Sequence, residues 1–323
     1  MPHNTGERPL TKQAYKLRLE GLREAEGHIK ANTLVRALGA PLGTAERATR
    51  LAATGRSVAK GRKPGWLKAA MNVTVTGLGA GSTTLDIQAP RLGDVRQEFG
   101  QRDFWLEQPE MGDTALDLGA RAIREARRSD ATGDHYDSST LSEILKLGRA
   151  AEGAGEVRYE LIPENGARRG FILETSECRG LRHRLDLIPA SRAAVVSGRL
   201  DEIGHGQGRF GLLMGQGLTL PGRLRRSSLD VELLRPLWGK LATVQGLVHF
   251  KPNGQPRLIE AYRISARTDG DTIFETPPHG ETSGQAALRR SPPVKAIAHV
   301  DPMVLWGVWP GDEPIEELLA QLD

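Results

Sequence analysis

Residues 192–266 read RAAVVSGRLDEIGHGQGRFGLLMGQGLTLPGRLRRSSLDVELLRPLWGKLATVQGLVHFKPNGQPRLIEAYRISA, and they carry the clearest structural pattern in the chain. Short runs of alternating apolar and polar residues are separated by glycine-rich turns. One turn contains Asn253-Gly254, the pair that favours a tight hairpin. The pattern predicts five strands and one helix between the third and fourth. We expect strands at 194–200, 210–214, 218–224, 241–250 and 258–264, and the helix at 229–238.

This β-β-β-α-β-β order resembles the OB-fold, a small five-stranded barrel. The resemblance covers 192–266 and is topological, because the stretch contains no diagnostic motif. It implies a nucleic-acid surface where aromatic rings stack on bases and cations hold phosphate. We expect the two aromatic candidates, Phe210 and Tyr262, to lie in the core. The cations predicted to contact nucleic acid are Arg209, Arg223, Arg225, Arg226, Lys251 and Arg257, together with Arg62 and Lys63 in a basic turn nearer the N-terminus.

The residues before this barrel-like module mix helical and strand patterns. Strands are expected at 73–78 and 84–89, which form a hairpin, and at 157–162 and 170–174. Helices are expected from Thr11, at 45–53 between a Thr44 cap and a Gly55 stop, at 66–70 after Pro64, at 114–128, and from a Ser138-Ser139 cap to about Gly153.

The sequence therefore predicts an α+β fold. An N-terminal mixed α/β domain is followed by a small five-stranded β-barrel-like module and an acidic C-terminal tail helix. The predicted organisation is disorder over 1–10, an α+β domain over 11–188, the barrel module over 189–268, and a linker, last strand and tail helix over 269–323.

Composition favours a cytoplasmic protein that does not contact a membrane. Cys178 is the only cysteine, so no internal disulfide can form. The first residues lack the apolar core of a signal peptide, and the chain has no apolar run long enough to span a bilayer. We therefore expect a cytoplasmic location, and we expect no cofactor.

Charge is segregated along the chain. Residues 1–70 contain 14 Lys or Arg and 5 Asp or Glu, a net charge of +9. Residues 300–323 contain 6 Asp or Glu and no Lys or Arg, a net charge of −6. A basic region attracts polyanions such as nucleic acid, although a solvated helix face has the same composition.

The C-terminal residues 301–323 combine two tryptophans with an acidic amphipathic helix, a pattern typical of partner-docking segments. They resemble the C-terminal tails of antitoxins from bacterial type II toxin–antitoxin pairs, and the resemblance implies a protein partner. Alternatively, the tail packs onto the protein's own core. The predicted docking residues are Trp306, Trp309, Ile315, Leu318, Leu319 and Leu322.

The sequence contains no pattern that predicts a particular reaction or a metal site. The glycines at 77–81 lack the Gly-Lys-Ser/Thr ending of a phosphate-binding loop and suit a hairpin turn better. Cys178 with His183 is a weak candidate for a thiol nucleophile.

The leading hypothesis is a non-catalytic protein that binds nucleic acid, a protein partner, or both. One alternative is an antitoxin- or immunity-like component of a defence cassette. Another is an enzyme that processes nucleic acid through scattered residues such as Asp134, His135 and Asp137.

Overall fold

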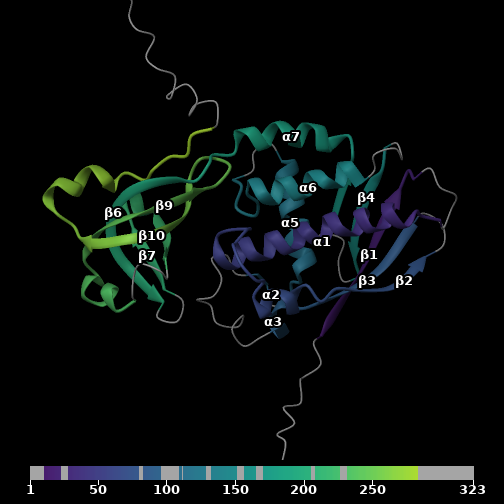
Figure 1. The fold of residues 1–323 in the computed structure, drawn as a ribbon, viewed down its shortest axis with the longest axis horizontal. Helices are drawn as coiled ribbons and strands as arrows, with labels where there is room; N and C mark the ends of the chain where they lie inside the picture. Colours follow the sequence, from purple (N-terminus) through teal and green to yellow (C-terminus); the bar gives the residue numbers. More distant parts are fainter. Residues whose placement is uncertain are drawn as a thin grey trace, which may run out of the picture. The chain divides into compact units, whose positions relative to one another are not determined.

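The computed structural model describes most of the chain between residues 11 and 282 (Figure 1). The predicted disordered segment at 1–10 and the predicted last strand and tail helix lie outside the described residues. The described ranges are 11–22, 28–79, 83–95, 109–110, 112–128, 132–150, 156–164, 170–204, 208–225 and 231–282.

An antiparallel five-stranded sheet forms the first part of the fold, with the strand order β2-β3-β1-β4-β5. The central strand β1 pairs with β3 on one side and with β4 on the other. The four strands predicted here are confirmed to within one residue at each end. The strands are β1 (Lys12–Glu20), β2 (Thr74–Gly79), β3 (Thr83–Pro90), β4 (Arg158–Pro163) and β5 (Phe171–Glu174).

The prediction of a helix from Thr11 is wrong, because this segment is strand β1. Tyr15, Leu17 and Leu19 are buried, while Lys16 on the opposite face is exposed. The alternation follows from the two-residue period of a strand, in which successive side chains point to opposite faces. The charged residues between the apolar ones are therefore the solvent side of a strand, not of a helix.

Helices pack on one face of the sheet and share a single core with it (Figure 1). The first helix runs through Thr44, so the predicted cap there is wrong, and the Thr44 hydroxyl donates to the Ala40 carbonyl at 2.9 Å. The predicted stop at Gly55 is confirmed, since Gly55 takes a φ of 75°. The helices are α1 (Ala31–Thr54), α2 (Gly65–Ala70), α3 (Leu92–Val95), α5 (Ala115–Arg127), α6 (Ser138–Ala150) and α7 (Glu177–Leu187).

Side-chain caps fix where α5 and α6 begin. Thr114 and Asp117 form a capping box at α5, in which the Asp117 carboxylate accepts from the Thr114 backbone N–H at 2.8 Å. At α6 the Asp137 carboxylate accepts from the backbone N–H of the third helical residue at 2.8 Å. The predicted Ser138-Ser139 cap is wrong, because these serines are already helical.

The order β1-α1-β2-β3-α5-β4 is a split β-α-β arrangement, in which β1 lies between β3 and β4. The helices cover one face of the sheet and leave the other open. Helix α7 had no counterpart among the predicted elements, because its stripe is interrupted by charged residues and by Gly180.

The second part of the fold is a closed five-stranded β-barrel. Neighbouring strands are antiparallel except β8 and β10, which run parallel, and β9 closes the barrel against β6. All five predicted barrel strands are confirmed, and β6 extends beyond the prediction at both ends. The strands are β6 (Arg192–Gly204), β7 (Arg209–Leu213), β8 (Thr219–Leu224), β9 (Leu241–Phe250) and β10 (Pro256–Ala266).

The helix predicted between the third and fourth barrel strands has the right place but the wrong type. It is a short 3-10 helix, η4 (Val231–Leu237). Pro236 has no backbone N–H to donate, and Gly239 takes a φ of 72° directly afterwards, so an α-helix cannot continue. Leu234 is nevertheless buried in the barrel core, as the apolar stripe predicts.

The predicted α+β fold class is confirmed by these two regions. A second 3-10 helix, η5 (Asp269–Glu275), follows the last barrel strand. None of the helices in the described ranges is long and apolar enough to cross a membrane.

Candidate nucleic-acid interface

Tyr262 is held on the outside of the barrel by a β-bulge. The pairing of β10 with β9 shifts by one residue between Ala261 and Arg263, and Tyr262 is the extra residue. Its side chain is 42% exposed, so the prediction that Tyr262 lies in the core is wrong. Bulges redirect side chains in this way. The same prediction for Phe210 is confirmed, since Phe210 is 3% exposed.

Two exposed arginines flank this tyrosine. The backbone N–H of Arg225 donates to the Ala261 carbonyl at 2.9 Å, which extends the parallel β8–β10 pairing and brings Arg225 beside Tyr262. Arg263 follows Tyr262 in the chain and is also exposed. We call Arg225, Tyr262 and Arg263 the Tyr262 patch. It combines a solvent-facing aromatic ring with two guanidinium groups.

Arg209 and Arg223, two of the predicted cations, are cross-strand neighbours on β7 and β8. Both are half-buried. Arg209 donates to the Ala53 carbonyl at 2.5 Å, at the end of α1. Arg223 lies opposite Glu260, which also forms an ion pair with Arg56 at 2.7 Å. These cations therefore have partners within the chain.

Lys251 and Arg257, at the β9–β10 turn, contact the loop before α6. Lys251 forms an ion pair with Asp134 at 2.5 Å. Arg257 is 7% exposed and donates to the backbone carbonyls of Gly133, Asp134 and Tyr136, the last at 2.9 Å. The Arg257 guanidinium is thus a structural tie between the barrel and this loop in the folded chain.

The remaining predicted site residues fall into two groups. Arg62 is exposed, and Lys63 forms an ion pair with Glu46 at 2.6 Å. The others lie outside the described residues: Arg226, Trp306, Trp309, Ile315, Leu318, Leu319 and Leu322.

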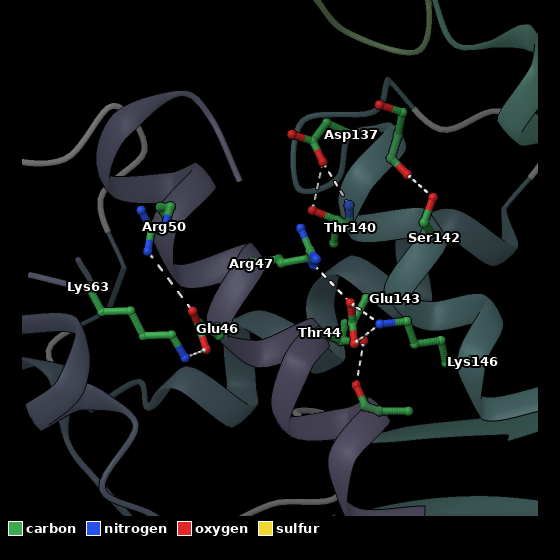
Figure 2. Close-up of polar contacts among 12 residues, drawn as sticks. Thr44, Glu46, Arg47, Arg50, Lys63, Asp137, Thr140, Ser142, Glu143 and Lys146 are labelled. Atoms are coloured by element: carbon green, nitrogen blue, oxygen red, sulfur yellow. Dashed lines mark hydrogen bonds and ion pairs between the residues drawn. The ribbon is translucent and has the colours of Figure 1, made fainter. Parts of the chain in front are cut away.

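A cationic pocket of about 380 Å³ lies between α1 and α6, with Lys63 at its edge. Figure 2 shows that its cations point at two carboxylates. Glu143 accepts from Arg47 and Lys146, both at 2.9 Å. Glu46 accepts from Lys63 at 2.6 Å and lies 4.0 Å from Arg50. An anionic ligand would have to compete with these carboxylates, so this α1–α6 pocket is a weak candidate for one.

The residues proposed for an enzyme have structural partners. Asp134 contacts Lys251, and Asp137 caps α6 and accepts from the Ser57 backbone at 3.2 Å. Burial raises the pKa of the Cys178 thiol, and this side chain is 7% exposed. Within the described residues no cluster of three or more His, Cys, Asp or Glu could hold a metal ion.

Acid should weaken the contacts between the barrel and the residues around it. Burial raises the pKa of Asp134, but hydrogen bonds from Lys251 and Thr132 outweigh it, so this pKa lies below its usual value. For Glu260, the neighbouring His249 and Arg56 outweigh burial in the same way. A carboxylate with a lowered folded-state pKa contributes stability above its unfolded-state pKa, near about 4, and loses it as the pH falls further.

We therefore expect the free energy of unfolding to decrease from about pH 5 downward. The double variant Asp134→Asn/Glu260→Gln should be less stable than wild type at pH 7 and should lose less on acidification. Urea denaturation at pH 7, 5, 4 and 3 measures the free energy of unfolding of wild type and of the double variant. If both proteins lose the same free energy between pH 7 and pH 3, these two carboxylates do not cause the acid sensitivity.

The chain matches no protein-family model, no curated protein and no solved structure. Its class is therefore defined by its own fold: a helix-covered antiparallel sheet followed by a closed five-stranded barrel of mixed strand direction.

Proposed function

We propose that this protein binds single-stranded nucleic acid, without catalysing a reaction, through the Tyr262 patch. The observation that supports this is the bulge that holds Tyr262 exposed beside Arg225 and Arg263. Any base can stack on a tyrosine ring, and the two guanidinium groups attract the phosphates on either side.

We also propose that the barrel is of the OB type. Its first three strands are consecutive, its third and fifth run parallel, and its fourth closes onto the first, which resembles the Greek-key barrel of the OB-fold. OB-folds commonly bind ligands on strands two and three and on the loops joining strands one to two and four to five. In this chain the loop between strands four and five, with Lys251, contacts Asp134, and Arg209 of strand two contacts Ala53. The proposed interface is therefore displaced to strands three and five.

The open face of the N-terminal sheet is a poorer candidate than the barrel. Its solvent-facing side chains include cations on β1 and carboxylates on the neighbouring strands β3 and β4, and none in the described strands is aromatic. Lys16 faces Asp86, and Arg18 is 3.4 Å from Glu160. A surface without aromatic rings and with paired charges offers no stacking platform.

The tail's proposed protein partner and the antitoxin-like alternative both rest on residues 301–323, which lie outside the described residues. They remain predictions. The enzyme alternative also remains a prediction, and its named residues have the structural partners given above.

Tyr262→Ala should weaken binding to a fluorescent single-stranded oligonucleotide by roughly 10- to 100-fold, because each stacked base contributes about 1–3 kcal/mol. Fluorescence anisotropy at 50 mM and 200 mM salt measures the affinity. Arg225→Gln/Arg263→Gln should in addition make the salt dependence shallower.

Trp238→Ala is the matched control. Trp238 is a barrel aromatic that is 66% exposed and lies outside the Tyr262 patch. The Trp238→Ala variant should bind the oligonucleotide with wild-type affinity. If wild type does not bind even at low salt, or if Trp238→Ala loses as much affinity as Tyr262→Ala, the proposed interface is wrong.

A further inference from the structure

A pocket of about 440 Å³ lies between α6 and α7, on the helical layer of the N-terminal region. Arg149 near the end of α6, and Arg179 and Arg182 on α7, contribute to its lining. The two helices approach closely because residue 148 is glycine: a Cβ there would lie 2.9 Å from the Cβ of Cys178. We call this the arginine pocket.

Its arginines differ from the cations of the α1–α6 pocket in having no carboxylate partner among the residues that the structure describes. None of Arg149, Arg179 and Arg182 forms an ion pair with another described residue, and all three are exposed. Glu156 is the one carboxylate in the described lining, so the lining has a net charge of +2. Three guanidinium groups around one space repel each other unless an anion lies between them.

The uncharged residues of the lining also suit an anionic ligand. Ser176 precedes the first residue of α7, and its hydroxyl makes no capping hydrogen bond. The Thr175 hydroxyl accepts from the Val157 backbone at 3.2 Å and keeps its own proton to donate. The Cys178 thiol, whose pKa is raised by burial, adds no negative charge. The pocket therefore offers hydroxyl donors and cations to an anion.

We infer that the arginine pocket binds a phosphate monoester. Arginine presents parallel N–H groups that match the oxygens of a phosphate, and a dianionic monoester balances the net charge of the lining. The volume is within the range of small-ligand sites, so a nucleotide or sugar phosphate is of suitable size. This inference is independent of the proposed function, because the pocket shares no residue with the Tyr262 patch.

Calorimetric titration of the full-length protein tests the inference, with adenosine 5′-monophosphate, inorganic phosphate and adenosine as probes. The monophosphate should bind and adenosine should not. Binding of inorganic phosphate without the monophosphate would contradict a monoester site, whereas tighter binding of the nucleotide or of a 5′-phosphorylated oligonucleotide than of inorganic phosphate would support it. If none of the phosphate probes gives a binding heat at concentrations up to about millimolar, the inference is wrong.

Arg179→Gln/Arg182→Gln should weaken monophosphate binding at least about 10-fold, since each charge-assisted hydrogen bond contributes more than about 1 kcal/mol. If the double substitution on α7 prevents folding, Arg149→Gln on α6 replaces it and should also weaken monophosphate binding. The control is Arg36→Gln/Arg199→Gln, which removes two exposed arginines elsewhere. An equal loss in the control would show only diffuse attraction by the net charge and would also overturn the inference.

Discussion

Arg257→Ala should lower the free energy of unfolding by roughly 3 kcal/mol. The Arg257 side chain is 7% exposed and donates to the carbonyls of Gly133, Asp134 and Tyr136. Without the guanidinium, these carbonyls lose their partner in a region that is largely closed to water. Each unsatisfied buried acceptor costs about 1–3 kcal/mol, and partial access of water reduces the sum.

Urea denaturation measures this loss, and Arg263→Ala is the matched control. Arg263 lies on the same strand but is exposed, so its removal should change stability by no more than about 0.5 kcal/mol. Arg257→Lys should fall between the two, because a single ammonium group cannot reach three carbonyls in the geometry of a planar fork. If Arg257→Ala and Arg263→Ala have the same free energy of unfolding, Arg257 has no structural role.

Gly246→Ala should destabilise the barrel by about 2–3 kcal/mol and should also weaken nucleic-acid binding. Gly246 lies on β9 opposite Ala261, next to the bulge. A Cβ at this position would lie 2.5 Å from the backbone oxygen of Glu260. Backbone atoms cannot rotate away as a side chain can, so β10 would have to move and the bulge that exposes Tyr262 would be disturbed.

Gly180→Ala is the control for this second prediction. Gly180 lies within α7, and a Cβ there would meet nothing within 4 Å. Alanine is favoured over glycine inside a helix by roughly 0.5–1 kcal/mol, so Gly180→Ala should raise stability. Thermal melts and the anisotropy assay compare the two variants. A Gly246→Ala protein with wild-type stability and affinity would show that the close approach of β9 to β10 does not matter.

Much of the fold is predictable because, in most segments, apolar residues recur with the period of the strand or helix that the segment forms. The barrel strands are confirmed for this reason. The sequence of β1 also fits a helix, because its apolar and charged residues, such as Leu17 and Arg18, occur at spacings that fit both periods, and only pairing with β3 and β4 decides between them. The helix between the third and fourth barrel strands is short where the sequence predicts a longer one, because Pro236 near its end cannot donate a backbone hydrogen bond.

The candidate site is less predictable than the fold. Composition identifies cations such as Arg257 and Arg225, but it does not show that the first is buried against backbone carbonyls and the second is exposed. The exposure of Tyr262 depends on a one-residue bulge, which breaks the alternation that predicts a core position. The arginine pocket requires α6 and α7 to be adjacent, and in the sequence Gly148 is a local sign of that approach.

The central claim is that single-stranded nucleic acid stacks on Tyr262. Photocrosslinking of the full-length protein to an oligonucleotide that contains 5-bromouracil, followed by peptide mass spectrometry, tests it most directly. We predict a crosslink within the peptide that contains Tyr262 and Arg263, and its loss in Tyr262→Ala. Crosslinks confined to residues of the N-terminal sheet and helices, or a crosslink that persists unchanged in Tyr262→Ala, would contradict the claim.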